Sequence, residues 1–196
     1  YDHATGDVTT NHYDYDEVHI DLRRLAEFAG ARLYRDAVVG LDRANRKVLC
    51  SNRPPVPYDV LSINTGSTPQ LHGVPGAQAH AIAVKPIGRF NERWLALLER
   101  VRRHAEPTTV AVVGAGAGGV ELLLALQVRL RRELQQLGRD PAALRFHLFT
   151  RSAHILPTHN ARVRARFEAL LAARGVQVHR GAAVAQVGPG RLHTAQ

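Results

Sequence analysis

The stretch Val110-Ala-Val-Val-Gly-Ala-Gly-Ala-Gly-Gly-Val-Glu121 decides the fold. In it a run of small and β-branched apolar residues is followed directly by a glycine-rich segment. The run Thr109–Val113 predicts a strand that is buried on both faces of a sheet. The segment Gly118–Leu137 predicts a long helix that ends at Gly138, a residue type that favours the left-handed backbone found after helices. The quoted stretch is therefore the junction between a strand and a helix.

The elements after this junction continue to alternate. A second strand is predicted over Arg145–Thr150, a second helix over Ala161–Ala173 with Gly175 at its end, and a third strand over Val176–His179. An order of strand, helix, strand, helix, strand indicates a parallel sheet with right-handed crossovers. The fold class is therefore α/β.

Three glycines at the junction follow the spacing G-x-G-x-x-G, in which each glycine has its own physical role. Gly114 allows the tight turn out of the strand. Gly116 lacks a Cβ, so a pyrophosphate can approach the backbone, and Gly119 lets the helix pack closely. The helix start at Ala117 and Gly118 offers free N–H groups and the positive end of the helix dipole. We predict a Rossmann-like dinucleotide-binding site; a glycine-rich turn without a ligand is the alternative.

The end of the second strand bears on the choice of dinucleotide. An acidic residue there would bind the ribose 2′-hydroxyl of NAD, but the strand ends in Thr150, Arg151 and Ser152. Two hydroxyls and a guanidinium suit a 2′-phosphate, because Arg binds phosphate through a fork of donors. The sequence favours NADP over NAD; Arg151 as an ordinary surface arginine is the alternative.

The first part of the chain has a different character. A helix is predicted over Leu22–Ala29, closed by Gly30, and a hairpin is predicted with strands over Ala37–Leu41 and Lys47–Cys50. A buried strand is predicted over Asp59–Asn64. An amphipathic helix with Trp94 on its packing face is predicted over Phe90–His104. We expect three regions: residues 1–76, a connector over 77–107, and the dinucleotide-binding domain over 108–196.

Composition limits the other function classes. The 196 residues carry a formal net charge of +9, and 24 of the 26 basic residues are arginines, scattered along the chain. Scattered charge predicts only weak, non-specific binding to nucleic acid. The histidines lack metal-ligand spacing, and no apolar run is long enough to span a membrane.

The single cysteine, Cys50, gives no redox pair and fits a reducing compartment. Because methionine is absent and the chain begins at Tyr1, we expect an internal piece of a longer protein.

The first half of the chain contains two further recognisable motifs. They are Tyr-Asp-Val-Leu-Ser-Ile-Asn-Thr-Gly-Ser-Thr-Pro over residues 58–69 and Gly-Val-Pro-Gly over residues 73–76. With the glycine junction they resemble the pyridine nucleotide-disulfide oxidoreductases, which are FAD- and NAD(P)-dependent flavoproteins. The resemblance implies that Thr65 and Gly66 lie against the flavin nucleotide. It also implies that Glu121 lies toward the nicotinamide, although an ordinary carboxylate in the first helical turn is as good an interpretation.

Within that family the segments 15–22 and 64–66 and the pair Lys85-Pro86 resemble the NADH-dehydrogenase-like branch, which includes domains fused to selenide, water dikinase. The family's first glycine motif for FAD and a later flavin segment are missing. The chain therefore resembles part of an FAD-binding domain followed by an NAD(P)H-binding domain that is incomplete at its C-terminus. The resemblance implies that other segments of the parent complete the flavin site.

The expected function of the parent is to pass hydride from NAD(P)H to flavin and then to an unknown acceptor, such as a quinone. The alternative is a non-catalytic module that senses a dinucleotide on the same fold. We expect no turnover by this chain alone and assign no catalytic residue or metal ligand. The expected location is the cytoplasm, or the inner face of the membrane if the parent attaches there, and a homo-oligomer is compatible with the sequence.

Overall fold

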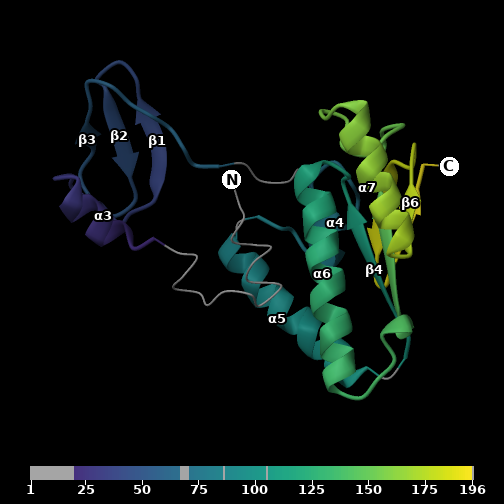
Figure 1. Cartoon of the computed structure of the whole chain (residues 1–196). Coiled ribbons are helices and arrows are strands. Elements are labelled where there is room, and N and C mark those ends of the chain that lie inside the picture. The colour runs from purple at the N-terminus through teal and green to yellow at the C-terminus, as the bar shows by residue number, and fades with distance from the viewer. Residues whose placement is uncertain (1–19, 67–70, 86, 105, 196) are drawn as a thin grey trace. The chain divides into compact units, whose positions relative to one another are not determined.

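The computed structural model describes residues 20–66, 71–85, 87–104 and 106–195, and these fall into two compact units (Figure 1). One unit lies within residues 19–67 and the other includes residues 68–196. Parts of the family resemblance, namely residues 15–19, 67–69 and Pro86, lie outside the described residues. The regions expected from the sequence, with limits at 76 and 107, stay a prediction.

The unit within residues 19–67 holds one helix and a small antiparallel sheet. Its elements are α3 (Leu22–Phe28), β1 (Val38–Asp42), β2 (Lys47–Cys50) and β3 (Val56–Pro57), and the strand order is β1-β2-β3. Asp21 caps α3 by accepting a hydrogen bond from the Arg23 N–H, at 2.9 Å. The carboxylate of Asp42 accepts two hydrogen bonds from Asn45 in the hairpin turn. The predicted helix and hairpin are confirmed.

The strand predicted over Asp59–Asn64 is wrong, because this segment is irregular and largely exposed. Val60 is 91% exposed and Ile63 is 64% exposed. Alternating apolar residues form a buried strand only where a neighbouring strand supplies hydrogen bonds and another layer covers the side chains. Within the described residues of this unit, no strand pairs with the segment.

The other unit is built on the predicted parallel sheet. Its strands are β4 (Thr108–Val113), β5 (Leu144–Phe149) and β6 (Val176–His179), in the order β4-β5-β6. Helix α6 (Ala117–Gln136) connects β4 to β5 through the short 3-10 turn η1 (Pro141–Ala143), and α7 (Ala161–Ala173) connects β5 to β6. The α/β class and the order of elements are confirmed.

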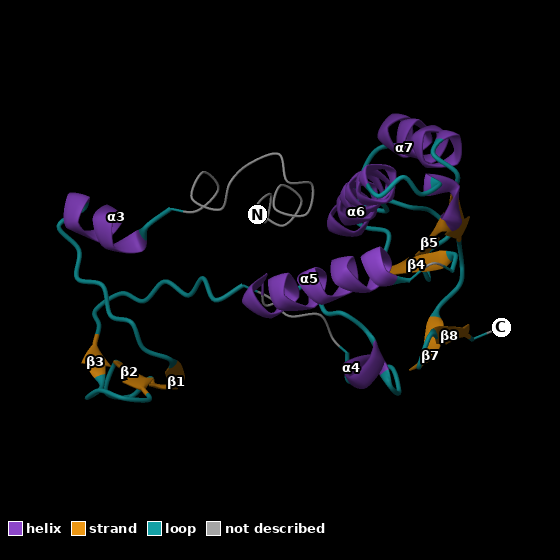
Figure 2. Cartoon of the chain, turned by 90° about the horizontal axis from the view of Figure 1, so that it is seen from below, coloured by secondary structure: helices purple, strands orange, loops and turns teal. Residues whose placement is uncertain are grey.

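Among the described residues, one face of this sheet is packed beneath helices, whereas on the other face the residues of β4 are exposed. Figure 2 shows α6 and α7 on the same side of the sheet, and Val110, Val112, Phe146 and Leu148 belong to the core beneath them. Residues that alternate with these point away from both helices, and Val113 is 59% exposed. The expectation that Thr109–Val113 is buried on both faces is therefore wrong, because both crossover helices lie on one side.

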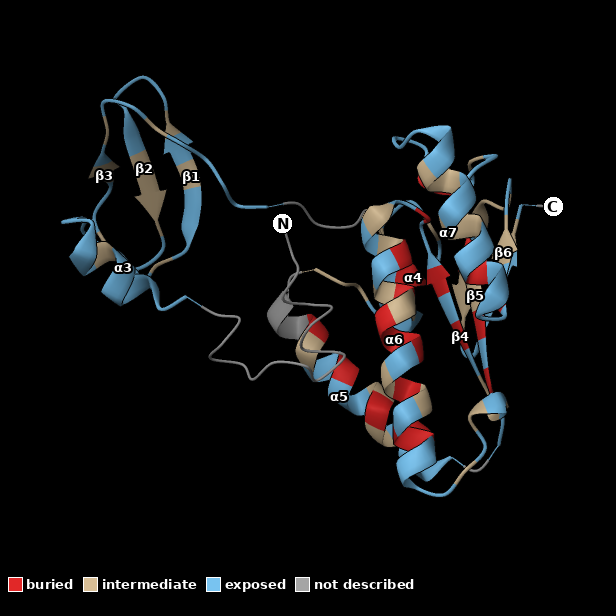
Figure 3. Ribbon diagram, in the orientation of Figure 1, coloured by how far each residue is buried: buried red, intermediate tan, exposed pale blue. Residues whose placement is uncertain are grey.

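Helix α5 (Ile87–Arg103) packs against α6 through an apolar stripe. The amphipathic helix predicted over Phe90–His104, with Trp94 on its packing face, is confirmed. Phe90, Trp94, Leu98 and Val101 are all at most 4% exposed, and Figure 3 shows the buried residues on α5 and α6. A short hairpin of β7 (Val184–Gly188) and β8 (Arg191–Thr194) follows the sheet.

The β7 strand is joined to the segment that precedes the short helix α4 (Ala77–His80). The Val187 N–H donates to the Pro75 carbonyl at 3.0 Å. A Cβ at Gly76 would lie 2.0 Å from the Val187 carbonyl oxygen, and the φ of Gly76 is +77°. Both the contact and the backbone conformation therefore require glycine at this position.

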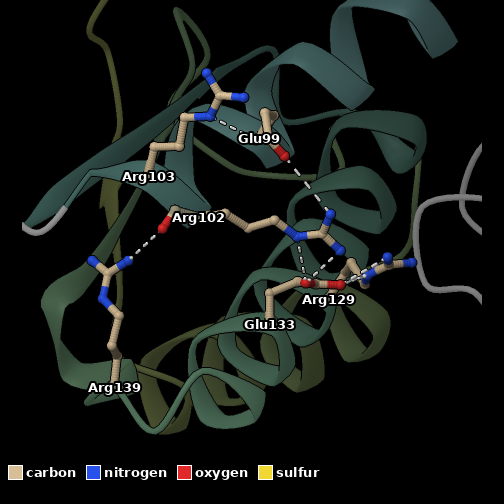
Figure 4. Close-up of polar contacts among 6 residues, drawn as sticks. All are labelled: Glu99, Arg102, Arg103, Arg129, Glu133 and Arg139. Carbon is tan, nitrogen blue, oxygen red and sulfur yellow. Dashed lines mark hydrogen bonds and ion pairs between the residues drawn. The ribbon is translucent and has the colours of Figure 1, made fainter.

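A buried carboxylate fixes α5 against α6 (Figure 4). The Glu133 side chain is 6% exposed and accepts hydrogen bonds from Arg102 Nε at 2.9 Å and Arg129 Nε at 2.8 Å. Nearby, the Arg139 guanidinium donates to carbonyls at the C-terminal end of α5, including that of Val101 at 3.0 Å. Burial by itself would raise the pKa of Glu133, but the hydrogen bonds and charges of the two arginines outweigh it, so the pKa lies below its ordinary value.

Replacing Glu133 with Gln should therefore destabilise this unit by about 1–3 kcal/mol at neutral pH, because two charge-assisted hydrogen bonds lose their acceptor charge. A group with a lowered folded pKa stabilises above its unfolded pKa, and that stabilisation is lost as pH falls through the folded pKa. The difference in unfolding free energy between wild type and Glu133→Gln should thus shrink below pH 4.5, the ordinary pKa of this carboxyl.

Urea unfolding of both proteins at several pH values measures this difference in unfolding free energy. Glu92→Gln is the matched control, because Glu92 is exposed on α5. If this difference did not depend on pH, the stabilisation would not come from the ionised Glu133 carboxylate and its two arginines.

Candidate dinucleotide-binding site

The glycine turn lies where β4 ends and α6 begins. Val113 pairs with Phe149 in the parallel register, and the Gly114 N–H donates to the Phe149 carbonyl at 2.9 Å. The φ of Gly114 is +110°, a conformation that favours glycine. Gly116 is the N-cap residue of α6, and no side chain of the described residues caps this helix. The first N–H groups of α6 have no acceptor within the helix, so they are available to an anion.

Two of the glycines differ in what the surrounding protein requires. A Cβ at Gly119 would lie 1.8 Å from the Gly114 carbonyl oxygen, so only glycine allows this contact. A Cβ at Gly116 or at Gly118 would meet nothing within 4 Å. The close packing predicted for Gly119 is confirmed. The open space at Gly116 fits the approach of a pyrophosphate, and that role stays a prediction.

The end of β5 lies beside this turn and is held by the last residue of β6 and by the loop that follows it. The Thr150 N–H donates to the His179 carbonyl at 2.9 Å, and the Thr150 carbonyl accepts from Ala182 at 2.9 Å. Thr150 is 7% exposed, and its hydroxyl accepts from the Ser152 N–H at 3.2 Å. This hydroxyl therefore shapes the loop, in which the next side chain, that of Arg151, is exposed and that of Ser152 is half-buried.

Arg151 is exposed, and within the described residues it has no hydrogen bond or ion pair. Other arginines of the same unit, such as Arg129 and Arg139, are engaged with carboxylates or carbonyls. An unengaged guanidinium next to the glycine turn is available to a phosphate.

The other predicted site residues are placed differently. Glu121 is exposed on the second turn of α6. Thr65 and Gly66 are exposed residues of the other unit, and the φ of Gly66 is +73°. The structure thus brings together the glycine turn and residues 150–152 at the carboxyl ends of β4 and β5, the edge at which open α/β sheets bind ligands.

Sequence reasoning missed two residues of this site. The loop after β5 returns to the glycine turn, where the Leu156 N–H donates to the Ala115 carbonyl at 2.7 Å. Ile155 is fully buried and Leu156 is 3% exposed, and the φ of Leu156 is +48°. A leucine rarely adopts this backbone conformation, so no sequence pattern would have indicated it.

A glycine turn between a strand and a helix, at the carboxyl edge of a parallel sheet, is the arrangement typical of the dinucleotide-binding class of folds. The family model described as pyridine nucleotide-disulphide oxidoreductase matches residues 10–193. The chain belongs to this family, as its motifs indicated.

Individual relatives share the fold over part of their length. The chain is 32% identical over 85 residues to the NADH dehydrogenase-like protein YutJ of Bacillus subtilis, a match that covers 43% of this chain and 23% of that protein. The structure of NDH2 from Plasmodium falciparum in complex with RYL-552 aligns with a TM-score of 0.82 and 15% identity, over 97% of this chain and 42% of that one.

An engineered water-forming NADPH oxidase bound to NADPH aligns with a TM-score of 0.71 and 20% identity, over 98% of this chain and 41% of that one. It is a mutant of the NADH oxidase of Lactobacillus brevis. The chain thus spans less than half the length of each of these proteins. In the described part of the chain, no helix combines the length and apolarity needed to cross a membrane.

The glycine turn offers a test that separates folding from ligand binding. Gly119→Ala should destabilise the unit by about 2–4 kcal/mol, because its Cβ would force α6 away from the Gly114 carbonyl. Gly116→Ala should unfold like wild type within about 0.5 kcal/mol, since its Cβ enters open space, but should weaken binding of NAD(P)H on the order of tenfold.

Urea unfolding and fluorescence titration with NADPH measure the two effects. Gly73→Ala is a control for loss of glycine alone, because a Cβ there also meets nothing within 4 Å. If Gly116→Ala bound the nucleotide as tightly as wild type, the space beside Gly116 would not be the pyrophosphate site.

Proposed function

We propose that this chain is the NAD(P)H-binding portion of an FAD-dependent oxidoreductase. The observation that carries the proposal is the uncapped start of α6 beside an unengaged arginine, in a chain of this family. When bound, NAD(P)H supplies a hydride and the flavin of the parent accepts it. The chain's own contribution is to bind and orient the nucleotide.

Each part of the site has a proposed task. The N–H groups at Ala117, Gly118 and Gly119 hold the pyrophosphate, and the missing Cβ of Gly116 leaves room for it. Arg151 and Ser152 hold the adenosine ribose, with Thr150 fixing the loop from below. Glu121 lies toward the nicotinamide. In the other unit, Thr65 and Gly66 contact the flavin nucleotide.

We further propose that the site prefers NADPH. Residues 150–160, directly after β5, include no carboxylate, so this loop brings no negative side chain to repel a 2′-phosphate, and Arg151 can donate to it. The engineered NADPH oxidase supports this preference by analogy. Three of its substitutions turn the consecutive residues Asp-Ala-Met of the NADH oxidase into Ala-Arg-Ser. The resulting sequence resembles Thr150-Arg151-Ser152, since both lack the acid and place an arginine before a serine.

Parallel titrations with NADPH and NADH test the preference. Arg151→Ala should weaken NADPH binding on the order of tenfold to a hundredfold, because charge-assisted bonds to the phosphate are lost, and should change NADH binding less than about threefold. Arg145→Ala is the matched control, since Arg145 is an exposed arginine of β5 itself. Equal losses for both nucleotides would exclude Arg151 as the 2′-phosphate ligand.

Anaerobic mixing of the full-length protein with NADPH tests the oxidoreductase activity. The flavin absorbance should bleach, and Gly116→Val should abolish the bleaching by blocking the nucleotide. Nucleotide binding without bleaching would favour a sensing module instead.

A second mixing step, of the reduced protein with a short-chain quinone, tests the acceptor. We favour a quinone because the bacterial relative is named as NADH dehydrogenase-like, and a quinone would place the parent at the inner face of the membrane rather than free in the cytoplasm. Reoxidation by the quinone no faster than by dioxygen would contradict this choice.

A further inference from the structure

Two histidines meet on the face of the parallel sheet that points away from α6 and α7 (Figure 2). His147 lies on β5 and His179 is the last residue of β6, and the strand register places their side chains on the same face. The Nδ1 atom of His147 is 2.9 Å from the Nε2 atom of His179, so one of these nitrogens donates a hydrogen bond to the other. The two strands are thus joined by a side-chain bond as well as by their backbone.

The ring of His179 is held from the side by Phe149, its neighbour across the strand pair. The centroids of these two rings are 4.3 Å apart and their planes differ by 7°, and Phe149 is only 9% exposed. The face of an aromatic ring attracts a cation. The stack therefore fixes the orientation of the His179 ring and also stabilises a positive charge on it.

The surroundings of His147 disfavour a positive charge. Arg145 precedes it by two residues and lies on the same face of β5. Burial, and then the charges of His179 and Arg145, hold the pKa of His147 below its ordinary value of 6.5. The first proton added to the pair therefore settles on His179, and His147 takes up the second at a lower pH.

The neighbouring residues offer no compensation for that second proton. On the same face of the sheet β4 and β6 contribute only uncharged side chains, namely those of Thr109, Ala111, Val113 and Gln177. The loop after β5 adds the exposed Arg151 and His154, and Arg180 after β6 is ion-paired with Glu168 of α7 at 3.1 Å. Among the described residues, no Asp, Glu or Cys joins the two histidines in a cluster.

A hydrogen bond between two imidazoles depends on how many protons they hold. When both rings are neutral, one nitrogen donates and the other accepts, and after one proton is added the charged ring donates to the neutral one. After a second proton is added, both facing nitrogens are donors and the two positive charges repel each other. We propose that His147 and His179 form a pH-sensitive latch between β5 and β6, which stays closed until the pair takes up its second proton.

The latch controls a short region where two loops are joined. Three backbone hydrogen bonds lie directly beyond it: Thr150 N–H to the His179 carbonyl at 2.9 Å, Gly181 N–H to the Ser152 carbonyl at 3.1 Å, and Ala182 N–H to the Thr150 carbonyl at 2.9 Å. Because His179 provides both a ring of the latch and the first of these acceptors, repulsion of its side chain loosens all three bonds. The inference concerns this region of the fold and does not depend on the proposed function.

Imidazole nitrogen NMR of the full chain tests the proton count. Between about pH 8 and about pH 5, the two histidines should titrate in two coupled steps, because they share one hydrogen bond. In His179→Gln, His147 should titrate in a single step closer to its ordinary pKa, because the charge of His179 is removed. Independent single-step titration of both histidines in wild type would overturn the proposal.

Hydrogen exchange of the full chain tests the opening. Protection of the Thr150, Gly181 and Ala182 amides, corrected for the intrinsic pH dependence of exchange, should fall about tenfold or more between about pH 7.5 and about pH 5. In His179→Gln and in His147→Gln the protection should not change with pH, because a glutamine amide forms hydrogen bonds but does not titrate. His154→Gln is the matched control and should behave like wild type, since His154 is an exposed histidine of the loop after β5.

The amide of Leu148, a fully buried residue of β5, separates local opening from general loosening. Its protection should stay unchanged at about pH 5, where the Glu133 carboxylate remains ionised because its pKa lies below 4.5. An equal loss of protection at Leu148 would overturn the latch, because the whole unit would then loosen. A loss at the three loop amides that persists in both glutamine variants would overturn it as well, since another group would then cause the opening.

Discussion

The contact between Gly119 and the Gly114 carbonyl is the constraint on which the site depends. Two backbone segments meet where a Cβ would lie 1.8 Å from an oxygen, so α6 starts directly against the end of β4. This contact aims the free N–H groups of the first helical turn across the carboxyl edge of the sheet. The position of those donors is therefore set by backbone packing, before any side chain contributes to the site.

The buried charge at Glu133 extends this constraint to α5. Helix α6 is fixed at its start by the glycine contact and near its end by two arginines that share one carboxylate. A paired, buried carboxylate contributes little net stability compared with an apolar pair, but it defines one relative position of two helices. The helix whose first N–H groups we propose as ligands of the pyrophosphate is thus held at both ends by different kinds of interaction.

Local patterns predicted the fold well where the physics is local. Strand, helix and terminal glycine signals placed β4, α6 and α7, because periodicity and the left-handed preference of Gly138 and Gly175 act within a few residues. The errors at Asp59–Asn64 and on the outer face of β4 concern burial, which depends on neighbours that a periodic pattern does not reveal. Leu156 was missed because a left-handed leucine is imposed by tertiary contacts and has no sequence signature.

The arginines show how the candidate site could be only half predicted from sequence. With 24 arginines in the chain, the type of residue at position 151 carries little information. Arg102, Arg129 and Arg139 look the same in the sequence, yet each is engaged within the protein. A guanidinium that satisfies its donors internally has little left for a ligand, whereas Arg151, free within the described residues, keeps all of its donors. Other arginines, such as Arg145, are also unengaged, so it is the place of Arg151 directly after β5, beside the glycine turn, that distinguishes it as the candidate phosphate ligand.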